Sequence, residues 1–337
     1  MTNRLMADNG SGKVIGSSDG ALAGKLGEQE QTSQYLVAPA TSSEANTIRL
    51  RLIPVACWRV DDIRFAFDSS FVTPDIEPDL RLLMRMREEH KDVKGQYPPF
   101  SVFGHADPTG DDTYNKTLSG HRAIAVYAVL TFHSQPTASV SLWENIAKAE
   151  SWGENQRSTM RNTTSLPEGM TDSALIQAYL SAICPAEVVL TPKDFLAQGA
   201  DSRGKGDIQG CSRFNPLLIF SASDQARYEQ ARHENDHQVL LERNMANATN
   251  RRVTVLLFRP RSVVLPSKWP CPRAAEGPAD CYKRFWSDAE ARRNTHLASE
   301  RRYEQTKDTF ACRFYDRLSN NSPCEQHAAI SAYPFSM

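Results

Sequence analysis

The chain has 337 residues and a mass of 37.7 kDa, with 40% apolar residues, 23% charged residues and a formal net charge of −1. Its apolar fraction is sufficient to fill a globular core, which excludes wholesale disorder, and its near-zero charge argues against a general nucleic-acid binder. No run of about 18 apolar residues is present, so the sequence offers no candidate transmembrane helix.

The N-terminal region differs in composition from the rest of the chain. Residues 1–47 are rich in Gly, Ser, Ala, Thr and Gln and have no hydrophobic periodicity, which predicts a flexible tail. Ordered structure is predicted to begin with a strand at Ile48, Leu50 and Leu52 that ends at Pro54, followed by a second strand over residues 60–67.

Hydrophobic periodicity and turn residues predict the remaining elements. In chain order these are a helix over 75–90, a strand over 100–103, a helix over about 118–132, an irregular stretch over 133–170, a helix over 172–183, strands over 188–190 and 216–220 around a glycine-rich loop at 199–210, a polar helix over 224–244, a strand over 252–258 and an Arg-rich helix within 283–317. The core is predicted to contain Phe65, Phe67, Leu83, Val102, Val126, Leu130, Val255 and Leu257.

The strongest chemical signal lies in residues 104–123. A predicted strand ends at Gly104, a polar loop carries Asp107, and Arg122 falls in the first turns of the helix predicted from Leu118. A helix N-terminus attracts anions, an arginine binds a carboxylate through two parallel hydrogen bonds, and an aspartate can accept an ammonium group. We therefore expect an exposed cleft that binds a ligand with an ammonium and a carboxylate on one centre.

These motifs resemble the OmpA-like (OmpA/MotB C-terminal) peptidoglycan-binding domain family. GHAD at 104–107 and YNKTLSGHRA at 114–123 match the family's pattern. IRFAFDSSFVTP at 63–74 is similar to its first strand and following loop, and NRRV at 250–253 is similar to the start of its final strand.

The resemblance implies an α+β fold over residues 48–260, in which a mixed β-sheet carries helices on one face. An insertion at about 133–187 and a Cys- and Arg-rich C-terminal extension at 261–337 stand outside the family pattern. The implied function is non-covalent binding of peptidoglycan through its diaminopimelate stem peptide, without a cofactor and without catalysis. The ligand-binding residues that the resemblance implies are Asp107, Arg122 and Asn115.

The same resemblance implies a location in the cell envelope, on the periplasmic side and associated with the outer membrane. Peptidoglycan is the implied partner, and proteins of the envelope or of a secretion or tail-like apparatus are further candidates. Residues 1–20 contain no apolar segment typical of a secretory signal, so the sequence leaves the route of export open.

A second, enzymatic interpretation rests on the HENDH segment at 233–237. An H-E-x-x-H motif on one helix places both histidines on the same face as zinc ligands, with the glutamate as general base. On the helix predicted over 224–244, His233, His237 and Glu234 would have these roles in a zinc metallohydrolase. The polar residues around the motif favour a solvent-exposed helix face instead.

The seven cysteines include no C-x-x-C pair. In an oxidising envelope, the turn-rich sequences between the last four predict two disulfides, Cys271–Cys281 and Cys312–Cys324, or another pairing of the same four. An odd thiol would then remain among Cys57, Cys184 and Cys211.

Overall fold

The computed structural model describes residues 52–281 except Leu217, Ile219 and Ser221, together with the backbone of two short strands further along the chain. The tail predicted over residues 1–47 lies outside the described residues. The described helices are α2 (Glu77–Glu89), α3 (Asp112–Thr131), α4 (Pro136–Ala149), α5 (Glu154–Thr164), α6 (Asp172–Ile183), α7 (Ala222–Glu234) and α8 (His237–Asn247). The described strands are β1 (Pro54–Asp61), β2 (Phe100–His105), β3 (Ile208–Gly210), β4 (Arg252–Phe258), β5 (Lys283–Phe285) and β6 (Phe310–Cys312).

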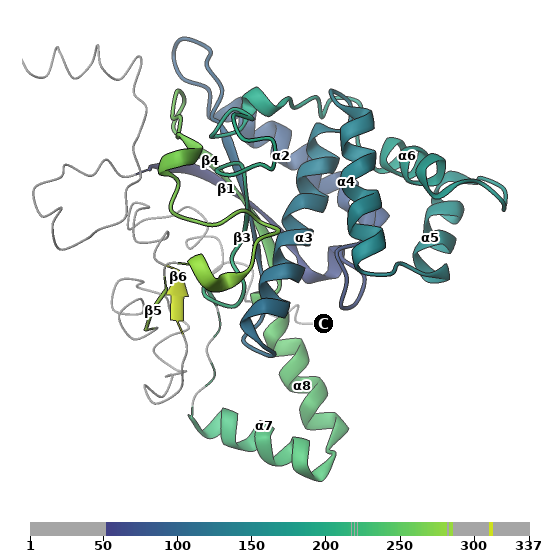
Figure 1. The fold of residues 1–337 in the computed structure, drawn as a ribbon, viewed down its shortest axis with the longest axis vertical. Coiled ribbons are helices and arrows are strands. Elements are labelled where there is room, and N and C mark those ends of the chain that lie inside the picture. The colour runs from purple at the N-terminus through teal and green to yellow at the C-terminus, as the bar shows by residue number, and fades with distance from the viewer. Residues whose placement is uncertain are drawn as a thin grey trace, which may run out of the picture. The chain divides into compact units, whose positions relative to one another are not determined.

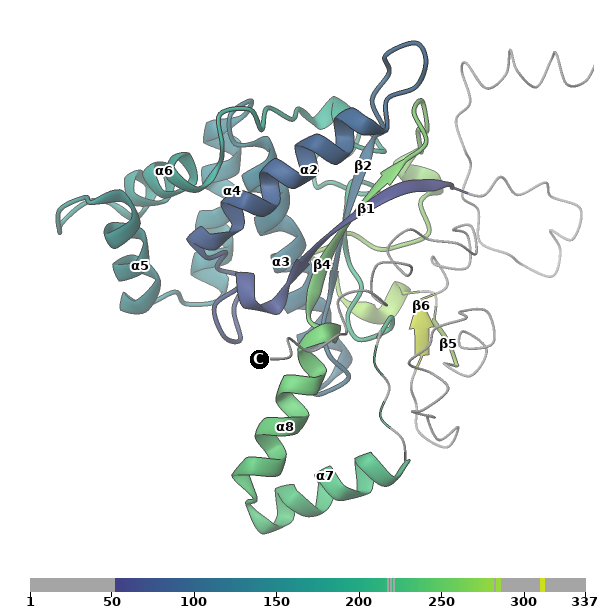
Figure 2. The ribbon, with the colours of Figure 1, turned by 180° about the vertical axis from the view of Figure 1, so that it is seen from behind.

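Four strands form a mixed sheet in the order β1-β4-β2-β3, in which β2 and β3 are parallel and the other neighbours are antiparallel. Helices α2 to α6 lie on one face of this sheet, and α7 and α8 extend beyond one of its ends (Figures 1 and 2). This arrangement confirms the predicted α+β fold with helices on one face. Among the described helices, none has the length and apolar character that crossing a membrane requires.

Strand β4 is central and buried along its whole length because both faces of the sheet are covered. On the helical face, Val253, Val255 and Leu257 pack in the larger core cluster with residues of α2 to α6. The alternate residues Leu256 and Phe258 belong to a second cluster on the other face, which later loop segments complete. Because every residue of β4 is buried, its sequence does not alternate between apolar and polar residues, as is usual for an internal strand.

Helix α3 crosses very close to β2. A Cβ atom added at Gly104 would lie 1.8 Å from the backbone oxygen of Ser119, so only glycine fits where strand and helix meet. The glycine of the GHAD segment is therefore required for the close packing of α3 on β2. This contact also positions the residues that follow β2 relative to α3.

The first strand differs from the prediction. Strand β1 runs from Pro54 to Asp61, and proline is tolerated at its start because β1 is an edge strand. Residues 48–51 of the strand predicted before Pro54 lie outside the described residues. Residues 60–67 do not form the predicted second strand, since the chain turns after Asp61, and Ile63 and Phe67 are 77% and 89% exposed. Phe67 is therefore wrong as a core residue; the other predicted core residues are buried.

Two helical regions also differ from the prediction. Helix α3 begins at Asp112, where the Asp111 carboxylate accepts hydrogen bonds from two backbone amides of the first turn, and not near Leu118. The stretch over 133–170 contains the regular helices α4 and α5. Its apolar residues are sparse, but Val140, Trp143 and Ile146 recur every three residues and are buried. The helices predicted over 75–90 and 172–183 are confirmed as α2 and α6.

Several shorter predictions in the second half are wrong. Residues 188–190 and the described residues of 216–220 form loops, whereas the third strand of the sheet, β3, lies in the stretch predicted as a glycine-rich loop. Leu218 and Phe220 are buried against α7 and α8. Their apolar character therefore reflects packing against these helices and not a position in a strand. Within 283–317, β5 and β6 are strands rather than helix, and the rest lies outside the described residues.

The cysteines do not follow the predicted pairing. Cys57 in β1 is disulfide-bonded, although the prediction left it among the candidate thiols. Cys271 and Cys281, which both lie in the described part of the chain, are not bonded to each other; both pack against the second core cluster. Cys184 is a buried thiol whose pKa is raised to about 12 by burial. Cys324 lies outside the described residues.

Leu257 and Phe67 are both predicted core residues, but only Leu257 is buried. Leu257→Ala should lower the free energy of unfolding by about 2–5 kcal/mol, because it leaves a cavity beneath the helices. Phe67→Ala should change it by about 0.5 kcal/mol or less, since this side chain is in solvent. Urea unfolding of both variants measures the difference, and equal effects would contradict the assignment of the core.

Candidate functional site

Three strand ends meet at one end of the sheet. Arg252, the first residue of β4, pairs with Asp61 at the end of β1 and with His105 at the end of β2. The residues just beyond these strand ends therefore lie close together, although they are far apart in the sequence. They are Asp62 after β1, Asp107 after β2 and Arg251 before β4.

These residues and Arg122 of α3 form a chain of alternating charges. Arg251 Nη1 lies 2.8 Å from Asp107 Oδ2, and Arg251 Nε lies 2.8 Å from Asp62 Oδ2. The other Asp62 oxygen, Oδ1, is 3.1 Å from Arg122 Nη1. Burial opposes the charge of Arg251, but its bonds to the two carboxylates raise its pKa overall. Both guanidinium groups are therefore held as cations beside carboxylates.

Arg122 is almost completely buried, with 1% of its surface exposed. Its Nε donates to the backbone oxygen of Ser69 at 3.0 Å, and its guanidinium lies over the Phe65 ring at 4.8 Å. Burial lowers its pKa, and the nearby Asp62 opposes that effect. Its Nη1 pairs with Asp62 at 3.1 Å but does not have the alignment of a strong hydrogen bond. Arg122 is therefore not exposed, because the segment after β1 packs over it with Asp62, Phe65 and Ser69.

A pocket of about 370 Å³ opens above these charges. The structure brings Asp107, Arg122 and Asn115 together in its lining. Asn115 is buried and donates from Nδ2 to the Thr109 backbone oxygen at 2.6 Å, which holds the loop that carries Asp107. Asp107 is only 14% exposed rather than open to solvent.

The helix N-terminus does not have the predicted part in this pocket. Helix α3 starts at Asp112, so Arg122 lies in its middle, and Asn115, Leu118 and Arg122 face the pocket from successive turns. The first-turn amides of Thr113 and Tyr114 already donate to the Asp111 carboxylate. A ligand carboxylate would therefore meet guanidinium groups rather than free helical amides.

Comparison with known proteins agrees with this arrangement. Residues 64–166 match the model of the OmpA family. The chain contains an OmpA-like domain. Over 69 residues it is 41% identical to outer membrane protein 41 of Porphyromonas gingivalis (strain ATCC BAA-308 / W83), a stretch that covers 20% of this chain and 16% of that protein. No solved structure matches the chain.

The match supports peptidoglycan binding and association with the cell envelope at the level of the family. It includes Asp107, Asn115 and Arg122 of the OmpA-like domain, and it extends into the segment predicted as an insertion at about 133–187. Helix α4 and α5 up to Thr164 thus lie within the matched residues.

Sequence reasoning missed two members of the charge chain, Asp62 and Arg251. Arg251 stands in the NRRV segment, which marked a strand start, and Asp62 was assigned to a strand interior. The sequence does contain a signal. Two arginines, Arg251 and Arg252, stand at the start of β4, and two aspartates, Asp61 and Asp62, stand at the end of β1. Such opposite charges would meet if the two strands were antiparallel neighbours. Recognising this signal requires the strand order, which places β4 between β1 and β2.

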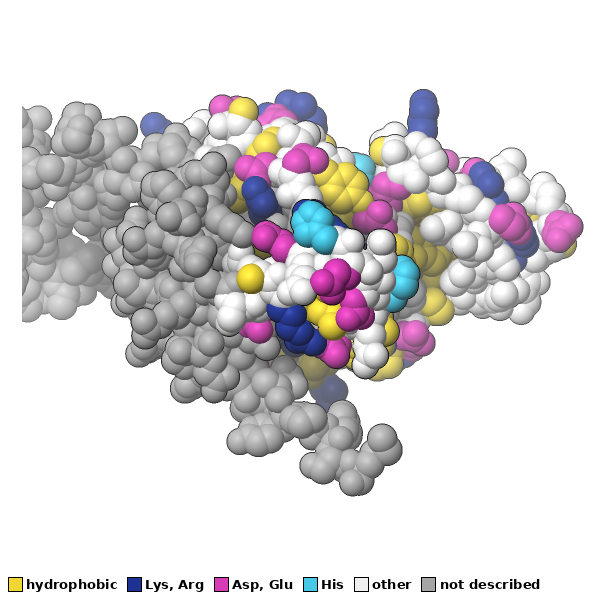
Figure 3. Space-filling model, turned by 90° about the horizontal axis from the view of Figure 1, so that it is seen from below, with side chains coloured by type: hydrophobic (Ala, Val, Ile, Leu, Met, Phe, Trp, Pro, Cys, Tyr) yellow, Lys and Arg dark blue, Asp and Glu magenta, His cyan; other side chains and the backbone are white. Residues whose placement is uncertain are grey.

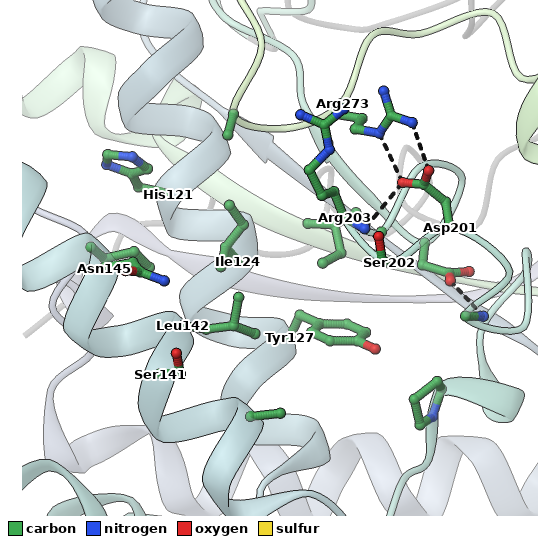
Figure 4. A pocket seen from close by; sticks show the side chains of 18 of the residues that line it. His121, Ile124, Tyr127, Ser141, Leu142, Asn145, Asp201, Ser202, Arg203 and Arg273 are labelled. Carbon is green, nitrogen blue, oxygen red and sulfur yellow. Dashed lines mark hydrogen bonds and ion pairs between the residues drawn. The ribbon is translucent and has the colours of Figure 1, made fainter. Parts of the chain in front are cut away.

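A larger cavity, of about 620 Å³, lies between α3, α4 and the glycine-rich loop (Figure 4). Its charged residues bind one another: Arg273 Nη2 lies 2.6 Å from Asp201 Oδ1, and Arg273 Nη1 lies 2.9 Å from Glu276. Asp207 is buried, which raises its pKa to about 7, and it accepts backbone hydrogen bonds on both oxygens. The charged groups of this cavity are therefore engaged by neighbouring groups of the chain.

The HENDH segment does not form the predicted zinc site on one helix face. Asn235 has a left-handed backbone conformation (φ 56°) that separates α7 from α8, so His233 and Glu234 lie at the end of α7 and His237 begins α8. All five residues are exposed. On the described surface at this end of the molecule, acidic, basic, histidine and apolar side chains are mixed (Figure 3).

Glu150, at the end of α4, is a buried carboxylate beside the pocket of the OmpA-like domain. It accepts hydrogen bonds from the Ser70 amide at 2.9 Å, the Ser70 hydroxyl at 2.6 Å and the Ser69 hydroxyl at 2.9 Å. His121 Nδ1 lies 3.1 Å from it, and Trp152 Nε1 donates to it at 2.9 Å. Burial acts to raise the pKa of Glu150, but these donors outweigh it and lower the pKa to about 2.

This lowered pKa predicts acid sensitivity. Ionised Glu150 stabilises the fold at pH values above its ordinary pKa of 4.5, and this contribution of about 3 kcal/mol is lost as the pH falls from there to about 2. Glu150→Gln should therefore be less stable than the wild type at pH 7, with a difference that vanishes near pH 2. Urea unfolding at a series of pH values tests this, and a constant difference would contradict it.

Proposed function

We propose that the pocket formed by Asp107, Asn115 and Arg122 binds the zwitterionic end of diaminopimelate in a peptidoglycan stem peptide. Binding is non-covalent and holds the protein, or the assembly to which it belongs, at the bacterial cell wall. The family match supports the wall as the target. The choice of a zwitterion rests on the alternating charges of the pocket.

One observation carries this proposal: Arg122, a buried cation whose Nη1 is paired with Asp62 at 3.1 Å without an aligned hydrogen bond, lines the pocket. A ligand carboxylate could add an aligned, charge-assisted hydrogen bond to this guanidinium. Asp107 and Asp68, which also line the pocket, offer oxygens to an ammonium group on the same ligand. A volume of about 370 Å³ suits one amino-acid end group rather than a whole glycan.

The test is co-sedimentation of the purified protein with isolated sacculi, combined with titration of a soluble diaminopimelate stem peptide. We expect the protein to sediment with sacculi and the soluble peptide to release it. Protein that stays in the supernatant, or that the peptide does not displace, would contradict the proposed site.

A further inference from the structure

The loop over residues 66–71 forms one wall of the pocket and is held mainly from outside the sheet. Phe65 and Val72 bridge its base, and the Ala66 amide donates to the Phe71 oxygen at 2.9 Å. At its tip, Phe67 and Asp68 line the pocket. Asp68 has a left-handed backbone conformation (φ 52°), which turns the chain sharply before Ser69.

The base of this loop is anchored in the helical segment. The Phe71 ring lies 5.3 Å from the Tyr179 ring of α6 and 5.2 Å from the Trp152 ring that follows α4. It also packs edge-on against Trp143 of α4 at 5.9 Å. This aromatic cluster fixes the base of the loop through ring packing, and only Trp152 among its members also hydrogen-bonds to Glu150.

Glu150 holds the residues between the tip and the base of the loop, Ser69 and Ser70. The carboxylate accepts from Ser69 Oγ and from both the amide and the hydroxyl of Ser70. The backbone oxygen of Ser69 accepts in turn from Arg122 Nε at 3.0 Å. Glu150 is not itself among the described residues that line the pocket. A continuous path of hydrogen bonds therefore connects the end of α4 to the guanidinium beneath the pocket.

We propose that Glu150 is a positioning residue that fixes Arg122 through the loop over 66–71, and that it thereby sets the preference of the pocket for a ligand carboxylate. This inference rests on the proposed function. It gives α4 a role in ligand recognition that the site residues alone do not reveal. Because Glu150 acts only on the Arg122 side, the contact of Asp107 with a ligand ammonium should not depend on it.

Two stem peptides separate these effects. One carries meso-diaminopimelate, and the other carries lysine, which has the side-chain ammonium but lacks the carboxylate. We expect the wild type to bind the first at least about 30-fold more tightly, because only the first engages Arg122. Glu150→Gln should weaken binding of the diaminopimelate peptide about tenfold or more, because a displaced Arg122 loses its contact with the ligand carboxylate. Affinity for the lysine peptide, which lacks that carboxylate, should change by no more than about twofold.

Isothermal titration calorimetry of both peptides makes the measurement, with Glu144→Gln on the same helix as the matched control. Ser70→Ala, which removes one donor to Glu150, should shift the preference in the same direction by a smaller factor and supports the result if Glu150→Gln folds poorly. A loss of preference confined to these variants supports the positioning role. An equal loss for both peptides, or no change, overturns it. A wild type that does not prefer diaminopimelate overturns the proposed function itself.

Discussion

Asp107→Asn should weaken the affinity for a diaminopimelate stem peptide by about 30-fold or more. The amide keeps the size of the side chain and an acceptor for the Thr109 amide, which donates to Asp107 at 2.7 Å. It removes the negative charge that would meet the ligand ammonium, and the loss of one partner from such a charge-assisted contact weakens binding by about 2–5 kcal/mol.

The fold should tolerate this substitution. Arg251 keeps its ion pair with Asp62 when Asp107 is neutral, so we expect the free energy of unfolding to fall by about 1 kcal/mol or less. Titration calorimetry and urea unfolding of the same sample separate the two effects. Glu89→Gln, an exposed acid at the end of α2, is the matched control for loss of one charge. Full affinity in Asp107→Asn would contradict the site.

Arg122→Ala should have the largest effect on stability. The substitution leaves the Ser69 oxygen without its donor, removes the cation from the Phe65 ring and deprives Asp62 of one of its two arginines. Breaking a buried charge pair in this way lowers the free energy of unfolding by about 3–5 kcal/mol. This differs from the expectation for an exposed arginine, for which a change of about 0.5 kcal/mol or less is normal.

A second arginine pair supplies the control for this prediction. Arg64 and Asp79 also form a close pair, at 2.7 Å, but each is more than a quarter exposed. Arg64→Ala should therefore lower stability by about 1 kcal/mol or less. Urea unfolding of both variants gives the comparison. If Arg122→Ala is as stable as Arg64→Ala, the buried charge chain does not hold the pocket together.

Local sequence was sufficient for the elements with strong periodicity. Local patterns correctly predict α2, α6 and β4 from the sequences at 75–90, 172–183 and 252–258. Each of these patterns extends over nearly the whole element. Errors arose where local signals conflicted. Alternation at Ile63, Phe65 and Phe67 indicated a strand, but only Phe65 finds a core neighbour.

The candidate site was likewise predictable from the sequence only in part. The family motifs were enough to select Asp107, Asn115 and Arg122, and these three do line one pocket. Their burial and their partners were not predictable from spacing. Asp62 and Arg251 are separated by most of the domain, and only the register that pairs Arg252 with both Asp61 and His105 brings them to Asp107.

By itself, then, the sequence determined the α+β class, the family resemblance and the residue types of the pocket, since these depend on short-range patterns. The tertiary structure decided that Arg122 is buried, that Asp62 and Arg251 complete its charge chain, and that Glu150 holds the loop above it. It also decided against a zinc site on one helix face, because a single left-handed residue at Asn235 divides that helix. Contacts between distant segments depend on strand order and helix packing, and neither is encoded in the spacing of neighbouring residues.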